Sequence, residues 1–191
     1  MTQGDVVSSE SEELILVDER DQETGFGSKA DCHDGDGLLH RAFSVFLFND
    51  RGEVLLQQRA AGKRLWPLFW SNSCCSHPRR GERIEDAAIR RLAQELGVRA
   101  ELRYLYKFQY HARFGDAGSE RELCSVFVGR SDDAVVANGT EVNACRWLSP
   151  DALDEALERR PEDFTPWFKL EWPRVRDSAP SPEPTRRAVN T

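Results

Sequence analysis

The sequence predicts a single α+β domain with a mixed β-sheet flanked by helices. Segments rich in β-branched and aromatic residues are spread along the chain, and the segments with helical periodicity lie apart from one another. A length of 191 residues suits one domain whose core needs no disulfide bonds. We therefore expect one folded domain over residues 12–172, after a disordered lead over residues 1–11 and before a proline-rich disordered tail over residues 173–191.

The N-terminal part is expected to form three strands. Glu13–Asp18 is a short apolar strand, whereas residues 19–37 are rich in Asp, Gly, Ser and Glu without an apolar period and predict a long loop. Arg41–Asn49 predicts a buried strand, and a turn connects it to the returning strand Val54–Arg59, which indicates a hairpin. Residues 59–64 follow as a basic loop in an otherwise acidic protein.

The C-terminal part combines helices and strands. Apolar residues recur at helical spacing over residues 85–96, and Gly97 follows as a glycine C-cap. Ser149 and Pro150 predict the start of a second helix. The remaining expected elements are strands at 102–112, 120–129 and 142–148, the second helix at 152–159, and a short last helix at 165–172.

Composition excludes several classes of protein. A net charge of −7 argues against general binding to nucleic acids or anionic membranes, so an anionic substrate needs a local basic pocket or a bridging cation. The chain has no run of about 18 apolar residues and no secretory signal pattern at its start. Its five cysteines are not spaced as a disulfide framework, and we expect a reducing, cytoplasmic location.

The stretch from Trp66 to Pro78 concentrates groups that can carry chemistry. Cys75 and His77 are two residues apart, so an extended backbone points both side chains to one face, while Cys74 faces the other way and is expected to pack. A nearby cation or His77 would favour the thiolate of Cys75. The alternative is that Cys75 is an inert, buried thiol.

Histidines and glutamates supply a candidate metal site. Glu120 and Glu122 share one face of a strand, where two carboxylates repel each other unless a cation lies between them. Together with three histidines they would form a set suited to Mn²⁺, Zn²⁺ or Fe²⁺. The four histidines of the chain are His33, His40, His77 and His111, and three of them lie beside features already described. The residues alone leave open that these are solvated side chains.

The helix at 85–96 resembles the helix of the Nudix box, whose core pattern is Arg-Glu-x-x-Glu-Glu-x-Gly. Arg90 and Glu95 match the pattern, but Arg91 and Gln94 stand where it has glutamates. Nudix hydrolases use these glutamates to hold Mg²⁺ on a diphosphate. The substitutions argue against hydrolysis, and the charged residues could equally form a solvated helix face.

The order of the motifs resembles the type 1 isopentenyl-diphosphate isomerases, a branch of the Nudix fold. The matching features are His33-x6-His40, Asn72-Ser73-x-Cys75-x-His77-Pro78, Glu95-Leu96-Gly97-Val98, Glu120-x-Glu122 and Thr165-Pro166-Trp167. The resemblance implies a Nudix-like fold with an added N-terminal strand and loop and C-terminal helices. It also implies isomerisation of isopentenyl diphosphate to dimethylallyl diphosphate through a tertiary carbocation.

The resemblance also implies roles for individual residues. Cys75 and Glu122 would be the proton-transfer pair, with donor and acceptor left open; Tyr110 would relay a proton, and the Trp167 ring would stabilise the cation. One Mn²⁺ or Zn²⁺ would be held by His33, His40, His77, Glu120 and Glu122. Glu95 would hold Mg²⁺ on the substrate diphosphate. The basic positions around the diphosphate would be Lys29, Arg59, Lys63 and Arg91.

Two alternatives remain at this point, a Nudix-type diphosphate hydrolase and a non-catalytic metal-binding or regulatory module. The expected partner is a small-molecule diphosphate, not a nucleic acid or a membrane. The sequence does not fix the oligomeric state, and a monomer is slightly favoured. Trp66 and Trp70 are expected to pack, and Arg64, Arg79 and Arg80 to be surface charges.

Overall fold

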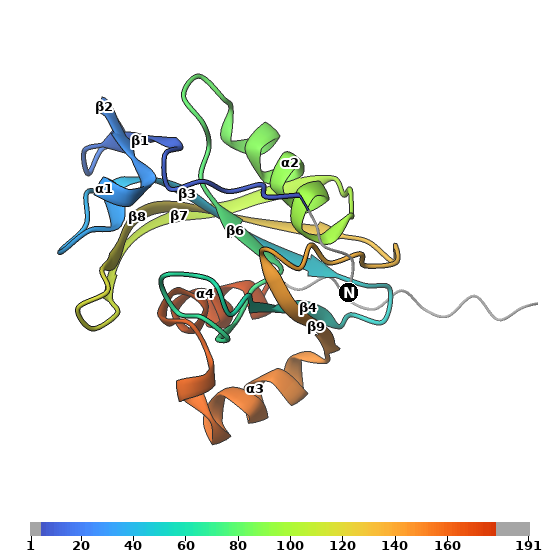
Figure 1. Cartoon of the computed structure of the whole chain (residues 1–191). Coiled ribbons are helices and arrows are strands. Elements are labelled where there is room, and N and C mark those ends of the chain that lie inside the picture. Colours follow the sequence, from blue (N-terminus) through green and yellow to red (C-terminus); the bar gives the residue numbers. More distant parts are fainter. Residues whose placement is uncertain (1–4, 179–191) are drawn as a thin grey trace, which may run out of the picture.

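The computed structural model describes residues 5–178 as a mixed nine-stranded sheet with helices on both faces (Figure 1), which confirms the predicted fold class. None of the helices in this described range is long and apolar enough to cross a membrane. The strands are β1 (Glu13–Val17), β2 (Glu23–Ser28), β3 (His40–Phe48), β4 (Val54–Arg59), β5 (Trp70–Ser71), β6 (Cys74–Ser76), β7 (Leu102–Arg113), β8 (Ser119–Arg130) and β9 (Val142–Leu148). The helices are α1 (Lys29–His33), α2 (Ile84–Leu96), α3 (Pro150–Arg159), η1 (Pro161–Asp163) and α4 (Pro166–Arg176).

Strand β3 is the centre of the sheet. It pairs in parallel with β8 along its whole length, from His40 opposite Glu122 to Phe48 opposite Arg130. The other strand pairs are antiparallel, which makes the sheet mixed. Alternate β3 side chains face opposite sides, so Phe43 packs under α2 while Phe46 packs against α4. Helices therefore cover both faces, and β3 is apolar on both, as buried strands are.

Helix α2 forms where the sequence predicted it. Ala88, Leu92 and Leu96 are fully buried in the core beneath the helix. Gly97 ends the helix in the left-handed region with a φ of 68°, and its N–H donates to the Ala93 carbonyl at 3.0 Å. A side chain at this position would be strained, so glycine is required. Truncating Leu92 to alanine would cost about 2–5 kcal/mol of unfolding free energy.

The C-terminal helices cover the opposite face. Ser149 caps α3 by accepting a hydrogen bond from the Ala152 N–H at 3.3 Å, as predicted. Helix α4 continues through Pro173 to Arg176, so the predicted start of the tail at residue 173 is wrong for residues 173–176. Proline lacks one helical hydrogen bond, but the buried side chains of Trp172 and Val175 on either side hold the helix against the core. Residues 179–191 of the predicted tail lie outside the described range.

The predicted loop over residues 19–37 is the main error of the sequence-based fold. It contains β2, which pairs along β1, and the short helix α1. Gly25 and Gly27 interrupt the alternation of β2, so only its pairing with β1 reveals it as a strand. Ser28 begins α1 by accepting a hydrogen bond from the Asp31 N–H at 3.1 Å.

Two further expectations need correction. The strands β3 and β4 pair only at Phe48 and Val54 and then separate, so they do not form the predicted hairpin ladder; β4 instead pairs with β9 and β5. Residues 5–11 of the predicted disordered lead follow an irregular path along the domain and are hydrogen-bonded to it. Residues 1–4 lie outside the described range.

Candidate active site

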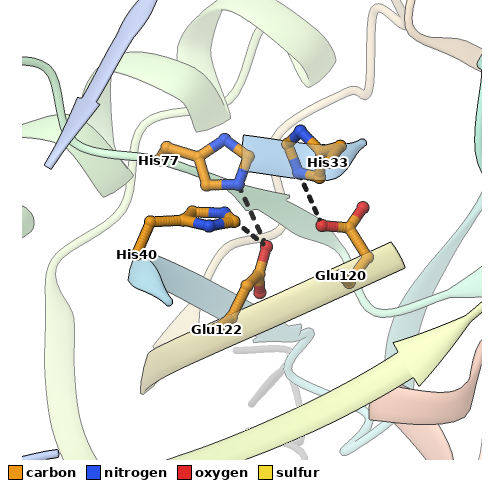
Figure 2. A group of neighbouring side chains, drawn as sticks. All are labelled: His33, His40, His77, Glu120 and Glu122. Carbon is orange, nitrogen blue, oxygen red and sulfur yellow. Dashed lines mark hydrogen bonds and ion pairs between the residues drawn. The ribbon is translucent and has the colours of Figure 1, made fainter. Parts of the chain in front are cut away.

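Three histidines and two glutamates meet at one end of the β3–β8 pair (Figure 2). His33 ends α1, His40 begins β3 and His77 follows β6, while both glutamates lie on β8. One ligand atom from each residue lies within 4.8 Å of every other. The five residues that the sequence singled out for a metal site, His33, His40, His77, Glu120 and Glu122, therefore come together.

The strand register explains how these distant residues meet. Parallel pairing places His40 directly opposite Glu122, and Glu120 lies two residues earlier on the same face of β8. The β6 strand pairs with β3 on its other side, with Ser76 opposite Phe43, and delivers His77 to the same edge. His33 arrives from α1, which the sequence had assigned to a loop.

The hydrogen bonds of the histidines fix their tautomers. His33 Nδ1 donates to the Lys29 carbonyl at 2.6 Å, and His40 Nδ1 donates to the Leu38 carbonyl at 2.7 Å. Because a carbonyl can only accept, the Nε2 atoms of both neutral rings carry lone pairs. No described residue forms a hydrogen bond with either Nε2 atom.

These lone pairs face carboxylate oxygens. His33 Nε2 lies 2.7 Å from Glu120 Oε2, and His40 Nε2 lies 3.7 Å from Glu122 Oε1. Two acceptors at such distances need a proton or a metal ion between them. Burial lowers the pKa of His33, but the Glu120 carboxylate outweighs it and raises the pKa above its usual value. The donor set therefore fits a divalent metal ion, which supplies the same positive charge.

Burial also sets the charge of the other ligands. It holds the pKa of His77 well below its usual value, and the neighbouring His40 and His33 act in the same direction. Burial raises the pKa of Glu122, but the neighbouring His40 and the hydrogen bond from the Tyr110 hydroxyl outweigh it, so the pKa is lowered. A neutral imidazole and an ionised carboxylate are the forms that bind metals.

A pocket opens beside this cluster and contains the predicted proton-transfer pair. Cys75 and Glu122 both line it, as does Tyr110, whose hydroxyl donates to Glu122 Oε2 at 2.7 Å. Arg59 Nη1 lies 3.9 Å from the Cys75 sulfur. Burial raises the pKa of Cys75 to about 12. Arg59 lowers this pKa, as expected of a nearby cation, but burial outweighs it and favours the thiol.

Aromatic side chains close the pocket near Cys75. The Trp167 indole N–H donates to Ser71 Oγ at 3.0 Å, which fixes the ring. Trp66 packs edge-on against Trp167 with ring centroids 5.2 Å apart. The ring centroids of Tyr110 and Trp167 are 6.0 Å apart. The guanidinium of Arg146 stacks on the Trp70 ring at 3.9 Å. Trp66 and Trp70 pack, as the sequence predicted, and Trp167 lines the pocket.

Basic residues also line the pocket in this acidic protein, and the part that they form is here called its basic end. All four predicted diphosphate-binding residues line it: Lys29, Arg59, Lys63 and Arg91. Arg91 is buried, and its Nη2 lies 2.6 Å from Glu95 Oε1 and 3.1 Å from Glu141 Oε2. Lys63 also pairs with Glu141. The predicted local basic pocket is therefore present, with carboxylates attached to its cations.

The other predicted residues differ in their relation to the pocket. Glu95 and His40 are buried and do not line it, although His40 belongs to the five-residue cluster. Arg64, expected to be a plain surface charge, lines the pocket and pairs with Asp34. Arg79 and Arg80 are exposed, as is His111.

Four residues at or near the site escaped the sequence analysis. Ser8 and Glu10 line the pocket but lie in the segment expected to be disordered, and Glu141 belongs to no motif. Glu171 is fully buried, and burial raises its pKa to about 8. It lies four residues after Trp167 on α4, so the helical repeat could have placed it on the buried face.

Comparison with known proteins agrees with the geometry. Residues 38–168 match the family described as NUDIX domain. The isopentenyl-diphosphate Delta-isomerase 1 of Photorhabdus laumondii is 46% identical over 163 residues, which cover 84% of this chain and 93% of that protein. The isopentenyl-diphosphate Delta-isomerase of Burkholderia multivorans is 45% identical over 157 residues, which cover 82% of this chain and 89% of that protein.

Solved structures give the same fold. A protein from Deinococcus radiodurans is similar with a TM-score of 0.64 at 26% identity, over 78% of this chain and 90% of that chain. A MutT protein from Methanosarcina mazei has a TM-score of 0.59 at 17% identity, over 73% of this chain and 94% of that chain, and shares the fold alone. The chain therefore belongs to the Nudix domain family and, within it, to the family of the isopentenyl-diphosphate Delta-isomerases.

Proposed function

We propose that this protein converts isopentenyl diphosphate into dimethylallyl diphosphate. The observation that carries the proposal is that Cys75 and Glu122 line one pocket together with the four predicted diphosphate-binding residues and most of the metal-ligand candidates. The names of the relatives support the same reaction. The pocket thus offers proton-transfer groups, a binding end for a diphosphate and a site for a divalent metal ion.

The reaction moves a double bond by one position and changes no oxidation state. A proton adds to the terminal alkene carbon, the positive charge develops on the tertiary carbon, and a second proton leaves the carbon on its other side. Cys75 and Glu122 supply one donor and one acceptor, and a proton must return to the donor before the next turnover. Positioned acid–base groups of this kind contribute about 10²–10⁴-fold to a rate.

The aromatic wall suits a carbocation intermediate. The Trp167 ring presents a π surface that attracts positive charge, a contribution of about 0.5–2 kcal/mol. Tyr110 and Trp66 pack against Trp167 and exclude water that would otherwise capture the cation. Tyr110 also holds Glu122 through its hydroxyl and can relay a proton to or from it.

The basic end and the acidic residues would hold the diphosphate and the metals. Lys29, Arg59, Lys63 and Arg91 are proposed to bind the diphosphate, with Glu95 holding its Mg²⁺. The five-residue cluster is proposed to hold one Mn²⁺ or Zn²⁺. When bound, this ion would neutralise the paired glutamates and fix the orientation of Glu122.

Hydrolysis of the diphosphate fits the pocket less well. Arg91 stands where the Nudix box has its first glutamate, and its guanidinium pairs with Glu95, the glutamate that remains. The helix therefore offers one carboxylate for a metal ion where the Nudix box offers several. The cytoplasmic location and the monomeric state stay predictions of the sequence.

An assay on isopentenyl diphosphate, with phosphate release measured in parallel, tests the proposal. We expect isomerisation without phosphate release. Cys75→Ala and Glu122→Gln should each lower kcat by on the order of 10³-fold, because each removes one proton-transfer group. Circular dichroism checks that both variants are folded.

Cys74→Ala is the matched control. Cys74 adjoins Cys75 but is buried in the apolar core under α2, so its loss affects packing rather than turnover. The proposal is wrong if either pocket variant keeps turnover close to that of the wild type, or if the wild type releases phosphate instead of isomerising its substrate.

A further inference from the structure

The segment Asp5–Glu10, here called the N-terminal strap, forms part of the basic end of the pocket. The sequence gives it no periodicity and no motif, yet Ser8 and Glu10 both line the pocket. Figure 1 shows the chain before β1 running toward α2, which carries Arg91. The strap therefore lies where the proposed function places the diphosphate of the substrate.

Backbone hydrogen bonds fix the strap at several points. Arg91 Nη1 donates to the Val7 carbonyl at 2.5 Å, and Asn138 Nδ2 donates to the Asp5 carbonyl at 2.9 Å. The Ala30 N–H donates to the Glu10 carbonyl at 3.0 Å. These contacts reach three separate parts of the fold, so the position of the strap depends on the folded domain and not on local sequence.

Ser8 brings a hydroxyl group to the pocket. Its Oγ accepts a hydrogen bond from Lys29 Nζ at 2.6 Å. A serine hydroxyl can accept and donate at the same time, so its own proton can point to an anion beside Lys29. A hydrogen bond from a neutral hydroxyl to a phosphate oxygen is charge-assisted and stronger than one between neutral groups.

Glu10 brings a negative charge to the same lysine. Its Oε1 lies 3.8 Å from Lys29 Nζ, and its side chain is 55% exposed at the rim of the pocket. A carboxylate at this distance competes with an incoming phosphate for the lysine, and it also repels the anion. Ser8 and Glu10 thus both contact Lys29, but they have opposite effects on the binding of an anion beside it.

We propose that the N-terminal strap tunes the affinity of the pocket for a diphosphate group. The Ser8 hydroxyl donates a hydrogen bond to a phosphate oxygen and strengthens binding, while Glu10 competes for Lys29 and weakens it. Competition from Glu10 also favours the release of a product that carries the same diphosphate as the substrate. This inference rests on the proposed function, because it takes the basic end as the diphosphate site.

Inorganic pyrophosphate with Mg²⁺ is the probe, measured as the inhibition constant against isomerisation. Ser8→Ala should raise this constant by about tenfold, the loss of one hydrogen bond to a charged group. Glu10→Gln should lower it by about threefold, because an exposed ion pair has a modest effect. Ser9→Ala is the matched control, since Ser9 is exposed, bonds to Ser11 and does not line the pocket, and its constant should not change.

The outcomes separate this inference from the proposed function. If the wild type isomerises its substrate but Ser8→Ala and Glu10→Gln both match Ser9→Ala, the strap has no role in binding and the inference is overturned. A shift of both variants in the same direction also overturns it, because that reports a general disturbance of the strap. If the wild type does not isomerise isopentenyl diphosphate at all, the proposed function itself fails. Direct calorimetric titration with pyrophosphate then still measures the three variants.

Discussion

Buried charge is balanced differently in two parts of the pocket: the metal end, which is the cluster of three histidines and two glutamates, and the diphosphate end, which is its basic end. At the metal end, Glu120 and Glu122 face the Nε2 atoms of His33 and His40, which carry lone pairs. At the diphosphate end, Arg91 and Lys63 already share the carboxylate of Glu141. The metal end therefore needs a cation, whereas the diphosphate end is neutralised by the chain itself.

This difference shows how each end must respond to its ligand. A cation at the metal end enters a set of donors that the strand register has already assembled, and it relieves repulsion. An anion at the diphosphate end must take the place of protein carboxylates on Lys29, Lys63 and Arg91. Binding there is an exchange of partners, so its free energy is a difference between two favourable sets of contacts.

Removal of one ligand from the metal end gives the largest expected effect. Wild-type protein should bind one transition-metal ion per chain, and His40→Ala should lower metal affinity by about 100-fold or more, because it removes a ligand and not merely its support. Elemental analysis after gel filtration measures the metal content. Metal should also raise the melting temperature of the wild type but not of the variant.

His111→Ala is the control for this experiment. His111 is exposed on β7 and does not belong to the cluster, so its loss should leave the metal content unchanged. Active wild-type enzyme without bound transition metal would contradict the contrast between the two ends. Equal metal loss from both variants would show that the histidines act only on stability.

Neutralising Glu141 tests the diphosphate end. Glu141→Gln keeps the shape of the side chain but removes the charge between Lys63 and Arg91. Pyrophosphate should then bind about fivefold more tightly, or ~1 kcal/mol, because it no longer competes with a carboxylate. Folding stability should fall, since two cations lose a common partner. Calorimetric titration measures the affinity, and thermal unfolding measures the stability.

Glu155→Gln provides the comparison. Glu155 forms an exposed pair with Arg159 on α3, where loss of the charge should change neither quantity measurably. Weaker pyrophosphate binding by Glu141→Gln would show that the carboxylate orients the two cations more than it competes for them. The diphosphate end would then be preorganised like the metal end, and the contrast would be lost.

The same contrast explains what sequence reasoning could reach. Spacing identified Glu120 and Glu122 on one strand face, and the resemblance of the motifs to a known family completed the set of five candidate ligands before the structure. Strands β3 and β8 and helix α2 were also predicted, because burial on one or both faces leaves a strong apolar pattern.

The missed features depend on contacts between distant segments. β2 carries two glycines and is a strand because β1 supplies its hydrogen bonds. The N-terminal strap is ordered by side chains such as Asn138 and Arg91, which lie far along the chain. Glu141 is identified as part of the site only by its ion pair with Lys63, which is 78 residues away in the sequence. No local pattern records such pairings, so composition alone suggested disorder or a loop.

A comparison of two buried glutamates, Glu141 and Glu171, separates the effect of burial on the pKa from the effect of cationic partners. Burial raises the pKa of Glu141, but Lys63 and Arg91 outweigh it, and the pKa is lowered. Glu171 is also buried, but its hydrogen-bond partners Ser44 and Cys124 are uncharged. Burial, together with the nearby Glu122 carboxylate, raises its pKa to about 8. Partners and not depth therefore decide which buried glutamate is ionised at neutral pH.

This difference predicts a pH dependence of stability. Glu171 has an unfolded pKa of about 4.3, so between that pH and its folded value of about 8 the folded state binds more protons than the unfolded state. The free energy of unfolding contributed by Glu171 therefore falls as pH rises through this range. Glu171→Gln cannot titrate, so its melting temperature relative to the wild type should increase from acidic to mildly alkaline pH. Thermal unfolding of both proteins across this range measures the effect, with the exposed Glu158→Gln as control. A constant difference between Glu171→Gln and the wild type would mean that Glu171 is ionised in the core, and that burial without a cation does not keep it neutral.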